Sequence, residues 1–125
     1  MKKVLVVEDD ADVSSNIKYM LTKTGYAVLI ANDGALGLTM AKDNLPDLII
    51  MDLMLPGMQG GDVVSAIKKY PPCKDIPVIL LTGLMSKKEE REGVETILID
   101  AKRYPAFSKP FDFPQLLKVI ENCLK

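Results

Sequence analysis

Histidine is absent from this chain of 125 residues, and cysteine occurs only at Cys73 and Cys123. Without histidine, the chain cannot build Ser-His-Asp or Cys-His nucleophilic sites, or zinc sites that use histidine ligands. The two cysteines have neither pairing nor metal-ligand spacing, so we interpret both as small packing residues in a reducing compartment. The chemistry that remains belongs to carboxylates, lysine, threonine and serine.

An excess of charge of one sign is also missing, since the formal net charge is −1. Nothing in the sequence therefore favours direct binding of nucleic acid. The apolar run after Met1-Lys2-Lys3 stops at Glu8, too early for a signal peptide, and no stretch is long enough to cross a bilayer. We expect one cytoplasmic domain over residues 1–125, without membrane insertion and without an output domain in this chain.

Apolar runs rich in β-branched residues recur along the chain. The run 48–51 is followed by Asp52 and a Pro-Gly turn, which is typical of a strand buried on both faces. Similar runs predict further strands at 4–7, 27–31 and 77–83, and a weaker pattern at 106–110 predicts an edge strand.

Segments with helical spacing of apolar residues separate these strands. We predict helices over 12–24, over 34–41, from 63 to the Pro71-Pro72 pair, over 86–101 behind a Ser86 cap, and over 112–124 behind an Asp112 cap. The apolar residues 97–99 also fit a short extra strand. Five alternations predict an α/β fold, a doubly wound parallel sheet with helices on both faces.

Polar side chains follow four of the predicted strands. Glu8 and Asp9 end the first strand, Asp52 the third, Thr82 the fourth and Lys109 the fifth. Because the carboxyl ends of parallel strands meet at one edge of a sheet, we expect these side chains to share a pocket.

Three carboxylates in one pocket repel one another by roughly 4 kcal/mol per close pair at an effective dielectric of about 20. A divalent cation would relieve this repulsion, and a site built only from oxygen ligands favours Mg²⁺. Beside the metal and the Lys109 ammonium, an Asp52 oxygen can attack a phosphoryl group and hold it as an acyl phosphate. The Thr82 hydroxyl can donate a hydrogen bond to that group.

Four segments resemble, in order, the signatures of the response-regulator receiver domain of two-component signalling. They are Val-Leu-Val-Val-Glu-Asp-Asp, Asp-Leu-Met-Leu-Pro-Gly-Met-Gln-Gly, Pro-Val-Ile-Leu-Leu-Thr-Gly and Lys-Pro-Phe. The resemblance covers essentially the whole chain. It implies a flavodoxin-like fold of five parallel strands in the order 2-1-3-4-5, and a phosphoryl group passed to Asp52 from a sensor histidine kinase or phosphotransfer protein.

The same resemblance implies a role for each residue of the pocket. Glu8 and Asp9 are the acidic pair, and with Asp52 and the backbone carbonyl of Met54 they hold Mg²⁺. Thr82 is the switch hydroxyl, and Lys109 pairs with the phosphate. The bond between Lys109 and Pro110 is expected to be cis.

Three features depart from the family pattern. Ala106 occupies the position of the usual switch aromatic, with Tyr104 and Phe107 out of register, and the segment between Thr82 and Lys109 is longer than usual. Met54 and Leu84 are apolar and cannot orient the water that hydrolyses the acyl phosphate. The first two departures predict an altered signalling face at the fourth helix and the loop after it, with an unusual partner or dimer mode. The third predicts a slowly lost phosphoryl group.

We therefore expect a phosphoacceptor switch, which catalyses only its own phosphorylation and slow dephosphorylation. Phosphorylation changes a face formed by the fourth helix, fifth strand and last helix, and so regulates a partner protein, an output domain or a homodimer. The alternative is an interaction module of the same fold that does not use phosphate. A phosphohydrolase of the haloacid dehalogenase type is a weaker third hypothesis, because it needs a second Asp where Met54 lies.

Overall fold

The computed structural model describes residues 1–83, 89–91 and 94–125. Within these ranges, seven strands form a sheet in the order β2-β1-β3-β4-β7-β6-β5. The strands are β1 (Lys3–Val7), β2 (Ala27–Ala31), β3 (Leu48–Asp52), β4 (Val78–Thr82), β5 (Glu89–Arg91), β6 (Val94–Ile99) and β7 (Lys102–Ser108). The helices are α1 (Ala11–Thr24), α2 (Gly34–Asn44), α3 (Gly60–Lys69), the short 3-10 helix η1 (Pro71–Cys73) and α4 (Phe113–Cys123).

Five of the strands form the predicted parallel sheet. β1 lies between β2 and β3, β4 pairs with β3, and β7 pairs with β4, all in parallel. The predicted order 2-1-3-4-5 is therefore confirmed, with β7 as the fifth parallel strand. None of the helices in the described part of the chain is both long enough and apolar enough to cross a membrane.

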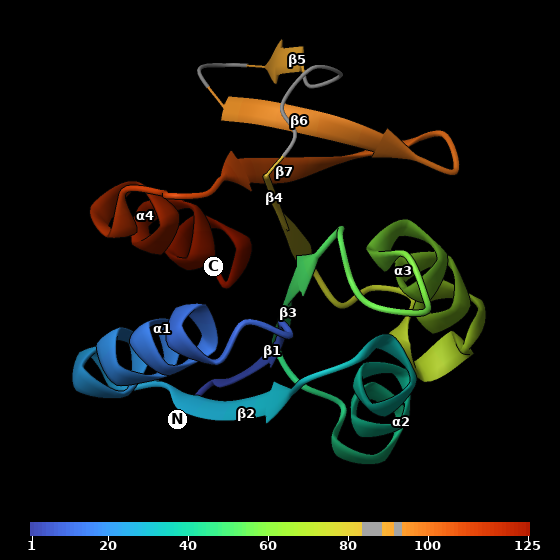
Figure 1. Ribbon diagram of the computed structural model, residues 1–125, viewed down its shortest axis with the longest axis horizontal. Coiled ribbons are helices and arrows are strands. Elements are labelled where there is room, and N and C mark those ends of the chain that lie inside the picture. Colours follow the sequence, from blue (N-terminus) through green and yellow to red (C-terminus); the bar gives the residue numbers. More distant parts are fainter. Residues whose placement is uncertain (84–88, 92–93) are drawn as a thin grey trace.

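Helices cover both faces of this sheet (Figure 1). On one face, α2 and α3 pack on a core that includes Leu5, Ile49 and Leu80. On the other face, α1 and α4 pack on a core that includes Val6, Ile50 and Ile79. Successive residues of the central strands point to opposite faces, so a strand covered on both sides must be apolar along its covered length, as β3 is from Leu48 to Met51.

The predicted helix over 86–101 is wrong at 89–91 and 94–99, where the chain forms the strands β5 and β6. β6 pairs antiparallel with both β5 and β7. Ile97 and Ile99 pack against the core beside α3, whereas Leu98 between them is 53% exposed. This period of two is a strand pattern, so the short-strand alternative for 97–99 is correct. Ser86 and the rest of 84–88, together with 92–93, lie outside the described residues.

A two-residue turn joins β6 to β7. Asp100 and Ala101 both have positive φ values, 51° and 67°, as the mirror-image turns that suit hairpins require. The hairpin also corrects the expected position of β7, which lies between β4 and β6 and is not an edge strand. In Figure 1, β6 and β5 extend the sheet beyond β7.

Local capping explains where α2 begins and where α1 ends. The Asp33 carboxylate accepts a hydrogen bond from the backbone N–H of Leu36 at 2.7 Å, and Gly25 ends α1 with a φ of 104°. Asp112 lies at the N-cap of α4 as predicted, but its side chain makes no capping hydrogen bond within the described structure. Pro114, near the helix start, has no backbone N–H that needs a cap.

Candidate functional site

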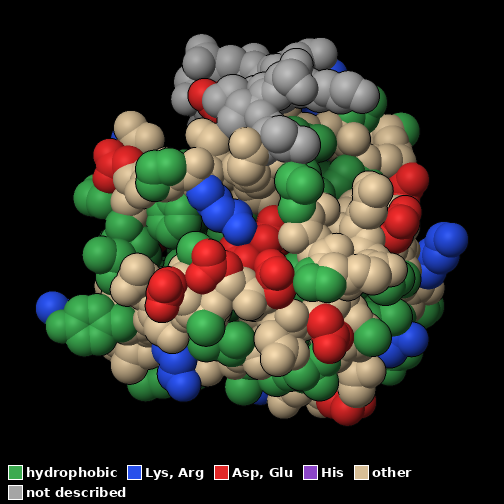
Figure 2. Space-filling model, viewed as in Figure 1, with side chains coloured by type: hydrophobic (Ala, Val, Ile, Leu, Met, Phe, Trp, Pro, Cys, Tyr) green, Lys and Arg blue, Asp and Glu red, His purple; other side chains and the backbone are tan. Residues whose placement is uncertain are grey.

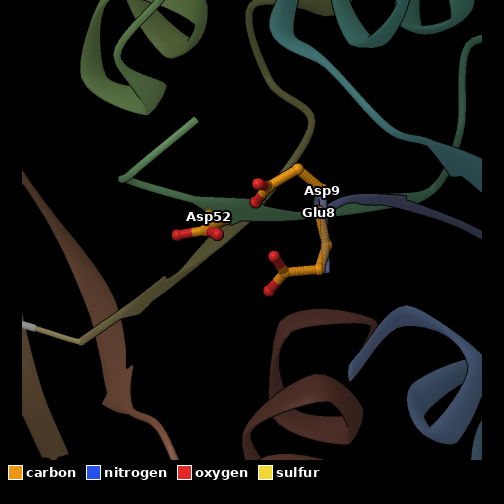
Figure 3. Close-up of side chains that lie close together, drawn as sticks. All are labelled: Glu8, Asp9 and Asp52. Carbon is orange, nitrogen blue, oxygen red and sulfur yellow. The ribbon is translucent and has the colours of Figure 1, made fainter. Parts of the chain in front are cut away.

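The carboxyl ends of the parallel strands bring the predicted polar residues to one edge of the sheet. Glu8 and Asp9 follow β1, Asp52 ends β3, Thr82 ends β4 and Lys109 follows β7. The carboxylates of Glu8, Asp9 and Asp52 have oxygens within 4.8 Å of one another and lie close together at the ends of β1 and β3 (Figure 3). Figure 2 shows acidic side chains gathered beside a basic side chain near the centre of this face.

Lys109 joins two of the carboxylates. Its ammonium lies 2.7 Å from Oε1 of Glu8 and 2.9 Å from Oδ2 of Asp52. Both acids are only 1% exposed, whereas Asp9 at the rim is exposed. Because burying an unpaired carboxylate is costly, one cation shared by two buried acids stabilises the pocket.

Backbone amides fix the remaining oxygens of the two buried acids. The N–H of Asp10 donates to Oε2 of Glu8 at 3.1 Å, and the N–H of Met54 donates to Oδ1 of Asp52 at 2.9 Å. These contacts come from the first residues after each strand, so the chain turns that leave β1 and β3 also orient the acids. The orientation of Asp52 is therefore set before any ligand binds.

Thr82 and Lys109 occupy neighbouring places on the adjacent strands. Thr82 is buried and pairs in register with Ser108, and its carbonyl accepts a hydrogen bond from the backbone N–H of Lys109 at 3.0 Å. The bond between Lys109 and Pro110 is cis, as the resemblance implied. The two residues therefore lie on the same rim of the pocket as Asp52.

Burial and the neighbouring charges in the pocket shift the pKa values of Glu8 and Lys109. Burial, reinforced by the neighbouring Asp52 carboxylate, raises the pKa of Glu8 to about 7, although Lys109 and the Asp10 N–H act in the opposite direction. Burial alone would lower the pKa of the Lys109 ammonium, but its contacts with Glu8 and Asp52 outweigh this and raise it. Near neutral pH the pocket thus holds a stable cation and an acid close to its titration point.

The residues present fit a hard divalent cation. Oε1 of Glu8 is buried and ion-paired with Lys109, yet in the described part of the structure it accepts no hydrogen bond of good geometry. It is a carboxylate oxygen with unused acceptor capacity beside the oxygens of Asp9 and Asp52. Carboxylate oxygens without nitrogen or sulfur ligands suit Mg²⁺.

The structure shows where two of the residues that depart from the family pattern lie, Ala106 and Met54. Ala106 is buried in β7 and pairs in register with Leu80, and Tyr104, two residues earlier, is buried in the same core. Met54 is 55% exposed beside Asp52, so its apolar side chain lies at the mouth of the pocket. Leu84 is outside the described residues.

Sequence analysis missed the part played by Gly60, the first residue of α3. Its N–H donates to the carbonyl of Leu53 at 3.1 Å, and a Cβ built on it would lie 2.2 Å from the backbone oxygen of Asp52. Only a residue without a side chain allows α3 to approach the end of β3 this closely. The only signal in the sequence is the Gly60-Gly61 pair soon after the Pro-Gly turn.

Comparisons with known proteins agree with this geometry. The family model described as the response regulator receiver domain matches residues 4–121. The chain is 36% identical over 122 residues to the probable transcriptional regulator ycf29 of Pyropia yezoensis, covering 98% of this chain and 53% of that protein. It is 32% identical over 124 residues to protein PilH of Pseudomonas aeruginosa, covering 99% of this chain and 98% of that protein.

A solved structure agrees over the whole chain. The response regulator TrrA of Thermotoga maritima, crystallised in complex with Mg²⁺ and BeF, superposes with a TM-score of 0.83 at 28% identity, covering 99% of this chain and 100% of that one. Several of the curated relatives are longer proteins, and the chain spans about half the length of the ones it matches first.

Proposed function

Because this chain belongs to the response-regulator receiver family, we propose that it is a phosphoacceptor switch in which Asp52 takes a phosphoryl group from a sensor histidine kinase or a phosphotransfer protein. The observation that carries the proposal is the Lys109 ammonium held between Asp52 and Glu8, with Asp9 beside them. A binding module that does not use phosphate has no need of three crowded carboxylates and a cation held between two of them.

Each residue has a defined task in the proposed transfer. Glu8, Asp9, Asp52 and the backbone carbonyl of Met54 would hold Mg²⁺, which supplies positive charge to the phosphoryl oxygens. An oxygen of Asp52 forms the new bond to phosphorus while the bond from phosphorus to the donor breaks.

The chain itself stabilises the charge of the acceptor and of the transferred group. The N–H of Met54 keeps Oδ1 of Asp52 in place, which holds the attacking carboxylate in a fixed orientation. Lys109, already 2.9 Å from Oδ2, neutralises charge on the phosphoryl group, and the Thr82 hydroxyl donates a hydrogen bond to it. When Lys109 and Thr82 are drawn toward the phosphate, β4 and β7 carry the change to the partner-binding face.

We further propose that residues 1–125 form one cytoplasmic receiver domain that regulates an output domain, a partner protein or a second copy of itself. The lengths of the relatives support both a receiver that acts on a separate protein and one that is joined to an output domain. PilH is about as long as this chain, whereas ycf29 is about twice as long.

The test of the proposal is the intact mass after incubation with Mg²⁺ and acetyl phosphate. We expect the parent to gain one phosphoryl group and an Asp52→Asn variant to gain none, because the amide cannot act as the nucleophile. Ser15→Ala, which removes an exposed hydroxyl on α1, serves as a control and should be phosphorylated like the parent. A parent that gains no mass and does not bind beryllofluoride would support the phosphate-independent interaction module instead.

We expect the phosphoryl group to be lost slowly because Met54 at the pocket mouth cannot orient water. A Met54→Asn variant supplies an amide at this position and should shorten the lifetime of the phosphorylated form by about tenfold. This is less than the roughly 10²- to 10⁴-fold of a positioned general acid or base, because an amide orients the water without taking its proton. The measurement is the decay of the phosphorylated mass after acetyl phosphate is removed. Met20→Asn on α1 is the matched control, and equal lifetimes for parent and Met54→Asn would contradict the prediction.

A further inference from the structure

Helix α3 touches the backbone of the pocket at its first residue. Gly60 approaches so closely that a Cβ there would lie 2.2 Å from the carbonyl oxygen of Asp52 and 2.7 Å from Cα of Leu53. The N–H of Gly60 also donates to the carbonyl of Leu53 at 3.1 Å. With no free space at this contact, a shift of the backbone at Asp52 and Leu53 must move the start of α3.

The same helix touches the β6–β7 hairpin on its other side. A Cβ at Gly61 would lie 3.9 Å from Cδ1 of Ile99, which is ordinary van der Waals contact. One turn further along α3, the Ser65 hydroxyl donates a hydrogen bond to the carboxylate of Asp100 in the hairpin turn. Val64 and Tyr104 are buried in the same core, so α3 and the hairpin also share apolar packing.

The turn of this hairpin has two residues with positive φ in succession, Asp100 and Ala101. This region is disfavoured by roughly 1–2 kcal/mol for a residue such as Ala101, whereas Asp adopts it more readily. A strained turn persists when its surroundings hold it, and the Ser65 hydrogen bond is one such restraint. The contact with α3 therefore helps to hold the turn in the observed conformation.

We infer that α3 couples the occupancy of the pocket to the conformation of the β6–β7 hairpin, through Gly60 at one end and the Ser65–Asp100 hydrogen bond at the other. The inference rests on the proposed function, since it takes the phosphoryl group on Asp52 as the input. The hairpin is the bistable element, and both the pocket and a partner bound to the hairpin bias its equilibrium. Ser65 and Asp100 are positioning residues that act on Asp52 through α3.

The proposed coupling predicts how loss of the Ser65–Asp100 hydrogen bond changes binding in the pocket. The Ser65–Asp100 hydrogen bond belongs to the conformation in which Lys109 is paired with the free Asp52 carboxylate, so it stabilises the resting state of the hairpin. Under the proposed coupling, filling the pocket opposes that restraint, so removing the restraint favours filling by the same factor. Residues that link two sites in this way change the coupling by about 2- to 30-fold.

The first experiment follows backbone amide resonances while Mg²⁺ and the phosphoryl mimic beryllofluoride are added. The Met54 amide reports the pocket, because it is hydrogen-bonded to Asp52, and the amides of 97–102 report the hairpin. We expect both sets to shift in the parent with the same dependence on beryllofluoride. A shift of Met54 with an unmoved hairpin would overturn the coupling and leave the proposed function standing, whereas no shift at either place would overturn both.

The second experiment compares beryllofluoride affinity between variants. Ser65→Ala removes the donor of the link and Asp100→Ala removes its acceptor, and we expect both to bind beryllofluoride about 2- to 30-fold more tightly than the parent. Asp62→Ala, which removes the same carboxylate from an exposed position of α3, and Ser15→Ala on α1 should bind like the parent. Equal or weaker binding by the two link variants would overturn the proposal.

Discussion

A Gly60→Ala variant is expected to lose about 3 kcal/mol of unfolding free energy, the upper part of the usual range for overpacking a tight interior contact. The added Cβ would lie 2.2 Å from the backbone oxygen of Asp52. The atoms that it meets belong to the backbone, so no flexible side chain can move aside to relieve the clash. Since α3 and the end of β3 must separate, the orientation of Asp52 changes as well. Phosphorylation by acetyl phosphate should therefore slow in the fraction that remains folded.

The neighbouring glycine provides the matched control. Among the residues that the structure describes, a Cβ at Gly61 meets only Cδ1 of Ile99 at 3.9 Å, so the site has room for a methyl group. Because alanine favours a helix over glycine by roughly 0.5–1 kcal/mol, Gly61→Ala should unfold at the same or a higher denaturant concentration than the parent. Urea unfolding of the three proteins measures both effects, and equal midpoints for Gly60→Ala and Gly61→Ala would show that the close approach carries no penalty.

A Glu8→Gln variant is expected to be more stable than the parent at pH 8, by on the order of 3 kcal/mol. The pKa of Glu8 is about 7 in the folded chain, against 4.5 for an unperturbed glutamate, so the folded chain binds this proton more tightly. The stabilisation from this group is complete below pH 4.5 and is lost as the pH rises to about 7. Glutamine keeps the side chain neutral at every pH and removes this loss.

The measurement is the free energy of unfolding between about pH 4 and 8 in buffer with a metal chelator. The parent should lose stability from about pH 4.5 to 7, and Glu8→Gln should lose correspondingly less. Glu121→Gln, at an exposed position of α4, removes the same charge and should follow the parent. Identical slopes for the parent and Glu8→Gln would falsify the assignment of this titration to Glu8.

The same substitution should weaken Mg²⁺ binding, because it removes one of the clustered carboxylates. Isothermal titration with Mg²⁺ would measure this loss. A variant that is more stable yet binds the metal less well would place Glu8 among residues kept for function at the expense of stability. An unchanged affinity would mean that Glu8 does not take part in holding the metal.

The sequence predicts the pocket well because its residues follow strands with an unmistakable pattern. Each of the runs before Glu8, Asp52 and Thr82 is apolar at every position, and in a parallel sheet their ends must meet. Lys109 follows a weaker strand, but the structure brings it into contact with both Glu8 and Asp52. Which acid titrates near neutrality is a property of burial and close contacts, so no sequence pattern reveals it.

The segment before β7 was predicted less well, for a definite reason. Val94, Ile97, Leu98 and Ala101 satisfy helical spacing, and the β-branched residues 97 and 99 equally satisfy strand alternation. Whether this segment forms a helix or a hairpin depends on Asp100 and Ala101, which adopt positive φ although neither is glycine. A turn of this kind usually contains asparagine or glycine, so the sequence carries no strong signal for the hairpin.

The antiparallel pairing of β6 with β7 also affects the order in which the sheet assembles. The two strands are joined by two residues, so their pairing needs almost no loop closure and hairpins of this kind form in about 1–10 μs. The parallel pairing of Thr82 with Ser108 joins residues distant in the chain and must wait for a much larger closure. β7 is therefore expected to dock onto β4 already paired with β6, so that the last parallel strand arrives as part of a preformed unit.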